Sequence, residues 1–116
     1  MIPFKLSELP HTWFIDLDGT VLLHNAHLSG QDELLPGVKE FWNQIPQEDF
    51  IVITTGRSTA YKKSTLKFLK EHNLQFNAAL FELPLGERII INDIKPAGLK
   101  TAISWNVERN QGFIKE

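Results

Sequence analysis

The sequence contains no cysteine, which excludes disulfide bonds, thiol nucleophiles and thiolate metal sites. No apolar run approaches the roughly 18 residues that a membrane-spanning helix needs. The first residues, MIPFKLSELPH, lack the basic start and the continuous apolar stretch of a signal peptide. Together these absences predict a cytoplasmic protein with no membrane partner.

Basic charge is not in excess either. The formal net charge of -2 at pH 7 argues against a general nucleic-acid binder, which is normally basic. What the chain does have is the composition of an ordinary globular protein, 42% hydrophobic and 22% charged, which supplies enough apolar material for one core. Because the 116 residues show no repeats and no linker, we expect a single domain over 1–116.

Segments typical of strands alternate with segments typical of helices. We expect strands in five apolar or alternating segments: Thr12–Leu17, Asp49–Thr54, Asn77–Leu83, Arg88–Asn92 and a peripheral Thr101–Val107. Helices are expected over 36–45 and, capped by Ser58, over 58–72, while the polar residues 21–35 are expected to form a flap loop. This alternation predicts an α/β fold, a parallel sheet with helices on both faces.

Acidic and hydroxyl side chains follow three of the expected strands. Asp16 and Asp18 end the first strand in the stretch FIDLDGT, Thr54 and Thr55 end the second, and Asp93 follows the fourth. Ligands of parallel sheets bind where the carboxyl ends of the strands meet, so these groups are expected to converge at one edge, which we call the rim. Taken alone, the DxDG pattern would equally suit a loop turn with solvated carboxylates.

Neighbouring carboxylates repel one another unless one is protonated or a cation lies between them. A hard divalent ion such as Mg²⁺ resolves the conflict, because it prefers oxygen ligands and keeps waters for a substrate phosphate. Gly19 removes a side chain beside the carboxylates and allows the backbone to approach an anion closely. The pattern therefore predicts a magnesium and phosphate site at the rim.

Three segments resemble the motifs of the haloacid dehalogenase superfamily of phosphohydrolases. They are FIDLDGT, FIVITTGR and IIINDIKP, which occur in the family's order between Phe14 and Pro96. The resemblance implies a three-layer Rossmann-like sheet. The short spacing between the motifs leaves no room for the cap domain of many relatives, so a small capless type is expected.

The resemblance also implies a role for each rim residue. Asp16 matches the nucleophile that forms a phosphoaspartate, and Asp18 matches the general acid and base. Magnesium would be held by Asp16, by the backbone carbonyl of Asp18 and by Asp93. Thr55 matches the phosphate-binding hydroxyl, with Thr54 as a rival because a shift of one residue exchanges them.

The family's third motif is a lysine, and the matching segment ELPLGER contains none. Arg88 and Lys95 are the nearest cations, and we favour Lys95 because it shares a rim loop with Asp93. Gly56 and Arg57 follow the second strand and are candidates for binding substrate. For Arg57, helix-start packing or a surface salt bridge is the other interpretation.

The leading hypothesis is a magnesium-dependent phosphomonoester hydrolase acting on a small phosphorylated metabolite, such as a sugar phosphate or a nucleotide. An open rim suits a large substrate, or a small one enclosed by a second subunit of a homo-oligomer. The missing lysine motivates an alternative, a catalytically weak phosphate-binding or regulatory module. A further alternative, a nucleic-acid end phosphatase, is suggested by the lysine face of Lys63, Lys67 and Lys70 but disfavoured by the net charge. The loop residues His24 and His27 are expected to be solvated.

Overall fold

A computed structural model of the chain describes residues 2–113. Strands and helices alternate along the chain in the order β1 (Thr12–Asp16), η1 (Ala26–Ser29), α1 (Val38–Asn43), β2 (Phe50–Thr54), η2 (Thr59–Tyr61), α2 (Lys62–Glu71) and β3 (Ala78–Leu80), where η denotes a 3₁₀ helix. None of the helices in this part of the chain has the length and apolar character that crossing a bilayer requires.

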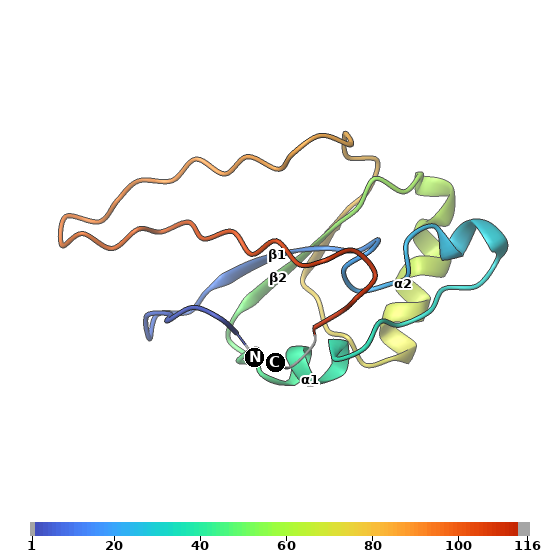
Figure 1. Ribbon diagram of the computed structural model, residues 1–116, viewed down its shortest axis with the longest axis horizontal. Helices are drawn as coiled ribbons and strands as arrows, with labels where there is room; N and C mark the ends of the chain where they lie inside the picture. Colours follow the sequence, from blue (N-terminus) through green and yellow to red (C-terminus); the bar gives the residue numbers. More distant parts are fainter. Residues whose placement is uncertain (1, 114–116) are drawn as a thin grey trace.

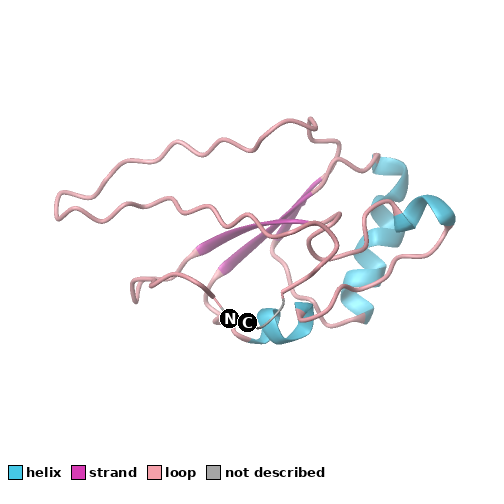
Figure 2. Cartoon of the chain, in the orientation of Figure 1, coloured by secondary structure: helices cyan, strands magenta, loops and turns pink. Residues whose placement is uncertain are grey.

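The three strands form one parallel sheet in the order β1-β2-β3, as the alternation of elements predicts. The register places Asp16 opposite Thr54 and Thr54 opposite Leu80, so the carboxyl ends of all three strands lie at one edge. The rim expected from the sequence is therefore present at the ends of β1 and β2, which lie side by side in Figures 1 and 2.

The core lies against one face of the sheet. Ile15 is paired with Ile53, and both side chains belong to the same buried cluster. Helix α1 contributes Val38, Phe41 and Trp42 to this cluster, and helix α2 contributes Leu69. The opposite face is less covered, since Phe14, Phe50 and Leu80 are 45–56% exposed. The structure is a mixed α/β fold, and the three-layer arrangement stays a prediction.

Helix α2 follows directly from its sequence. Ser58 precedes the 3₁₀ turn η2 that leads into α2, and its hydroxyl accepts a hydrogen bond from the backbone N–H of Ala60 at 3.2 Å. The predicted cap is therefore present, but at the start of η2, since the N-cap of α2 is Tyr61. Thr65 and Leu69 are one helical turn apart and fully buried, because residues four apart share a helix face. The lysines of α2 lie on its exposed side.

The predictions of strands at 88–92 and 101–107 are wrong. Both segments belong to a long arm, residues 84–108, which leaves the sheet, turns at 95–98 and returns (Figure 1). Within the described residues, the backbone of 84–93 makes no hydrogen bond to other backbone. A strand exists only where its backbone pairs with a neighbour, so the apolar pattern of these segments is not sufficient to make them strands.

Phe41 is the centre of an aromatic cluster that ties the end of the described chain to the core. It stacks on Phe113 with ring centroids 4.2 Å apart and meets Trp13 and Trp105 edge-on. The backbone N–H of Phe113 donates to the Pro36 carbonyl at 2.9 Å. The chain beyond the arm is thus packed against the start of α1.

This close contact depends on Gly112, whose φ of +69° falls in the left-handed region. A Cβ at Gly112 would also overlap the backbone carbonyl of Pro36. Gly112→Ala is expected to lower the free energy of unfolding by about 2–4 kcal/mol, from backbone strain and overpacking together. Urea unfolding followed by circular dichroism measures this loss.

Gly30→Ala is the matched control, because Gly30 also has a positive φ, of +91°, but no atom lies within 4 Å of its added Cβ. That variant is expected to lose only about 1 kcal/mol, the part due to the backbone. Equal losses in the two variants would show that the contact between Gly112 and Pro36 does not contribute.

Candidate functional site

The turn after β1 presents two carboxylates at the rim. Asp16 is the last residue of β1, and its side chain is 48% exposed. The next residue, Leu17, is fully buried, and its backbone N–H donates to the carbonyl of Thr54 at 3.0 Å. Asp18 follows with a side chain that is only 16% exposed. The two carboxylates therefore lie in different environments.

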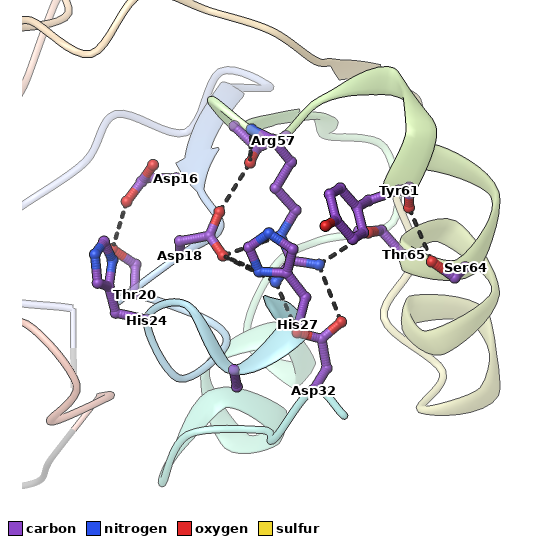
Figure 3. A network of polar contacts seen from close by, with 12 residues as sticks. Asp16, Asp18, Thr20, His24, His27, Asp32, Arg57, Tyr61, Ser64 and Thr65 are labelled. Carbon is purple, nitrogen blue, oxygen red and sulfur yellow. Dashed lines mark hydrogen bonds and ion pairs between the residues drawn. The ribbon is translucent and has the colours of Figure 1, made fainter. Parts of the chain in front are cut away.

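The carboxylate of Asp18 is held by groups from the end of β2. Its Oδ2 accepts a hydrogen bond from Thr55 Oγ1 at 2.9 Å. Its Oδ1 accepts one from Arg57 Nε at 3.0 Å, and Arg57 Nη2 lies 2.8 Å from the same oxygen (Figure 3). The structure thus brings Asp18 and Thr55 together, as the sequence predicts for the rim, and adds Arg57, whose contact with Asp18 was not predicted.

Arg57 is the most connected side chain of the site, and its own side chain is 1% exposed. Its guanidinium binds Asp32 through two hydrogen bonds of 3.0 and 2.7 Å and donates to Thr65 Oγ1 at 2.8 Å. Burial alone would lower the pKa of Arg57, but the hydrogen bonds to Asp32 and Asp18 outweigh it and raise the pKa above its ordinary value. Arg57 is therefore a buried, permanently charged link between the flap, the rim and α2.

Sequence reasoning did not find Asp32 or Thr65. Asp32 lies in the loop predicted as a flap, where an isolated acidic residue is usually solvated. Thr65 is fully buried on α2, and no sequence signal tied it to Arg57. For Arg57 itself, the interpretation as a surface salt bridge is wrong, because both of its carboxylate partners lie with it inside the fold.

Asp16 is left open to a ligand. Its Oδ2 accepts a hydrogen bond from Thr20 Oγ1 at 3.1 Å, and Arg88 Nη2 lies 3.9 Å from its Oδ1. Partial burial raises the pKa of Asp16 above its ordinary value, and the charge of Asp18 adds to this, while Thr20 and Arg88 oppose it. Asp16 combines an accessible oxygen with a nearby cation.

The cation beside Asp16 is Arg88, not the favoured Lys95. Lys95 lies at the turn of the arm, where its backbone N–H donates to the Leu99 carbonyl at 2.9 Å. A second arginine, Arg109, lies over the turn after Asp18, since a Cβ at Gly19 would be 3.1 Å from Arg109 Cγ. Sequence reasoning assigned Arg109 no role, and only the return of the arm brings it here.

Asp93 does not join the other carboxylates. It lies in the arm, where its backbone carbonyl accepts a hydrogen bond from Thr101 Oγ1. Among residues 2–113, no group of three His, Cys, Asp or Glu side chains is placed to hold a metal. The expected position of Asp93 depended on a strand at 88–92, and without that strand nothing carries it to the rim. The residues as arranged do not fit the predicted magnesium ligand set.

The three candidate site residues at the end of β2, Thr54, Thr55 and Gly56, differ in exposure and in hydrogen bonding. Thr55 is fully buried, and its hydroxyl both donates to Asp18 and accepts from the Arg57 backbone N–H at 3.0 Å. Thr54 is 6% exposed and lies beside Asp16 in the sheet. Gly56 is exposed at the start of the next loop. The hydroxyl aimed at the carboxylates is that of Thr55.

The flap histidines are not solvated as expected. The side chain of His27 is 11% exposed, its Nδ1 lies 3.8 Å from Asp18 Oδ1, and its ring meets Tyr61 edge-on at 4.7 Å. Burial, and after it the charge of Arg57, lowers the pKa of His27. The backbone N–H of His24 donates to the side chain of Asn110 at 2.8 Å. The flap is therefore packed against the rim, with His27 of η1 beside Asp18.

Comparison with known proteins gives one informative similarity. No protein-family model matches the chain, and no curated protein matches it. A chain of a solved structure described as "Structure of the Pnkp1/Rnl/Hen1 RNA repair complex" is similar, with 26% sequence identity and a TM-score of 0.51. The match covers 73% of this chain and 30% of that chain, so this chain spans under a third of the other's length.

Removal of the Arg57 side chain tests its structural role. Arg57→Ala leaves Asp18 and Asp32 without their shared cation in a site where both are at most 16% exposed. Truncating one partner of a buried ion pair is strongly destabilising, so we expect a loss of about 3–5 kcal/mol in the free energy of unfolding. Chemical denaturation at pH 7 measures it.

Arg88→Ala serves as the control, since the Arg88 side chain is 42% exposed and its ion pair with Asp16 spans 3.9 Å. Exposed pairs of this kind contribute at most about 1 kcal/mol. Similar losses in the two variants would contradict a special role for the buried Arg57.

Proposed function

We propose that this protein is a phosphomonoester hydrolase of the haloacid dehalogenase type, with a Rossmann-like three-layer fold and no cap, acting on a small phosphorylated metabolite. One observation carries the proposal: Asp16 offers a half-exposed carboxylate at the end of β1, with Arg88 Nη2 3.9 Å away and Asp18 held beside it. A nucleophile, a cation for the phosphate and a second carboxylate are the parts that this reaction needs.

In the proposed first step, an oxygen of Asp16 attacks phosphorus, the bond from phosphorus to the ester oxygen breaks, and that oxygen takes a proton from Asp18. In the second step, water attacks the phosphorus of the phosphoaspartate and gives a proton to Asp18, and the bond between phosphorus and the Asp16 oxygen breaks, which frees the Asp16 carboxylate and inorganic phosphate. Arg88 and Arg109 flank the turn that holds Asp16 and would balance the charge of the phosphoryl group.

The two oxygens of Asp18 have separate tasks in this proposal. Oδ1 faces Arg57, which keeps the carboxylate oriented. Oδ2 accepts a hydrogen bond from the Thr55 hydroxyl at 2.9 Å, and it is the oxygen that exchanges the proton. Thr55 thereby couples the general acid to the end of β2, where a phosphate oxygen would be bound.

Magnesium remains a prediction from the acidic composition of the rim. Because Asp93 lies in the arm and Asp18 is paired with Arg57, the steps above assign no task to a metal. An assay with added Mg²⁺ and with EDTA tests the cofactor prediction separately from the roles of Asp16 and Asp18.

Asp16→Asn tests the nucleophile. The amide cannot attack phosphorus, so hydrolysis of an aryl phosphate should fall by about 10³-fold or more, with an unchanged circular dichroism spectrum. The matched control is Glu71→Gln at the end of α2, which makes the same change of acid to amide on an exposed residue and should retain activity.

Full activity in Asp16→Asn would overturn the mechanism. Binding of inorganic phosphate by the unaltered protein, without turnover of a broad panel of phosphate esters, would instead favour a phosphate-binding or regulatory module. The ion pair between Asp18 and Arg57 is the observation that supports this alternative, because it occupies the group expected to act as the acid.

A second candidate function is the processing of RNA ends. The similar solved chain belongs to a complex described as an RNA repair complex, and α2 exposes Lys63, Lys67 and Lys70. If this candidate is correct, a 5′-phosphorylated RNA oligonucleotide should bind with an affinity that falls steeply with salt concentration. Fluorescence anisotropy over a range of salt concentrations measures the slope.

Replacing the three lysines by glutamine should reduce the logarithmic salt slope by about 0.7 for each phosphate contact that is lost. A triple glutamine variant of exposed lysines outside α2, made at Lys5, Lys39 and Lys100, is the control. Equal slopes in the two variants, or no binding by the unaltered protein, would exclude the lysine face as an RNA site.

A further inference from the structure

The sheet has two outer strands, β1 and β3, and the longer of the two, the five-residue β1, has an open edge. Within the described residues, β1 pairs with β2 along Thr12–Asp16 and has no strand on its other side. Phe14, in the middle of this edge strand, is 56% exposed. An open, apolar edge strand is a ready template for another strand, and natural proteins normally cover such edges.

The outgoing limb of the arm also exposes apolar side chains to solvent. Ile89 and Ile91 are 83% and 91% exposed and, two residues apart in extended chain, share one side of it. Leu85, at 90% exposure, extends the apolar character toward the body. Among the described residues, the backbone of 88–92 makes no hydrogen bond, so this segment has both the side chains and the free backbone groups of a strand that lacks its sheet.

The geometry directs the arm away from its own sheet. Both of its ends are anchored at the rim, where Leu83 N–H donates to the Thr55 carbonyl and Asn110 N–H to the Gly19 carbonyl. Figure 1 shows the arm running from there beyond the rest of the molecule. The longest dimension is accordingly 49 Å against 30 and 25 Å for the others. The radius of gyration of 14.7 Å exceeds the roughly 13 Å of a compact chain of this length.

We propose that two copies of this chain exchange arms, so that residues 88–92 of each copy pair with the β1 edge of the other. The occupant is a second copy because each chain carries both an arm and an open β1 edge, and the segment 88–92, with three isoleucines at its centre, has five residues, as many as β1 and more than the three of β3. A two-fold exchange covers both edges and both arms and closes the assembly. The proposal does not depend on the hydrolase function.

The first test is the mass of the unaltered protein by light scattering over a range of concentrations. We expect twice the 13.3 kDa mass of the chain. Ile89→Lys combined with Ile91→Lys should give the single-chain mass, with at least a 100-fold weaker association. Because both side chains are exposed in the single chain, circular dichroism and thermal unfolding at low protein concentration should show a folded variant.

A matched control replaces two exposed leucines outside the arm and the edge, Leu9→Lys combined with Leu28→Lys, which are 49% and 61% exposed. This control should remain a dimer. A single-chain mass for the unaltered protein at all concentrations would overturn the proposal, as would a dimer that persists in the arm variant.

The absence of native cysteine permits a second, positional test. A Thr12→Cys variant is mixed with a variant carrying either Glu87→Cys or Asn92→Cys, at the two ends of the apolar run, and oxidised. A disulfide between the two variants joins separate chains by construction, so a cross-linked dimer supports the exchange, and the partner that reacts gives the strand direction. Cross-linking that occurs only within one chain, in a double variant with Thr12→Cys, would show that the arm folds back onto its own sheet.

Discussion

The buried guanidinium of Arg57 is the interaction on which the rest of the site depends. It lies between Asp18 from the turn after β1, Asp32 from the flap and Thr65 from α2, and its side chain is 1% exposed. An arginine can satisfy three groups in one plane because its donors form a rigid fork, which a lysine lacks. A single charge therefore fixes the position of three separate segments relative to the sheet.

This arrangement also sets the electrostatic contrast between the two rim carboxylates. Asp18 has its charge compensated inside the fold, whereas Asp16 is half-exposed, with the exposed Arg88 as its cation and with a raised pKa. Two acids of identical chemistry, one residue apart on either side of Leu17, are thereby given different properties by their surroundings. Such a division suits a reaction in which one carboxylate attacks and the other transfers a proton.

Much of the first 80 residues could be predicted from the sequence. The strands β1 and β2, the Ser58 cap of η2 and the meeting of Asp18 with Thr55 follow from local patterns of apolar residues, from turn residues and from the geometry of parallel strands. These features depend on the conformational preferences of neighbouring residues, which can be read directly from the sequence. Strand β3 was expected over 77–83 and is shorter, because pairing with β2 ends at Leu80.

The course of the arm and the full set of residues around the site could not be predicted, because both depend on contacts between residues that are far apart in the sequence. The run RIIIN has the composition of a buried strand, but its state is decided by whether an edge is available to it, and here it is exposed. Asp93 was misplaced for the same reason, and Arg88 was placed second to Lys95. Asp32 and Arg109 reach the site through the paths of loops, which side-chain periodicity does not describe.

The stacking of Phe113 on Phe41 has a consequence for how the chain is built. It returns the polypeptide to the core after the arm, so residues 84–108 form an excursion whose two ends are both secured. An excursion of this kind can change in length without disturbing the elements on either side, since closing a somewhat longer or shorter loop alters the chain entropy only slightly. The tip of the arm, residues 94–100, is therefore the part of this fold that can change in length at least cost, whereas Arg88 and Trp105 on its two limbs contact the rim and the aromatic cluster.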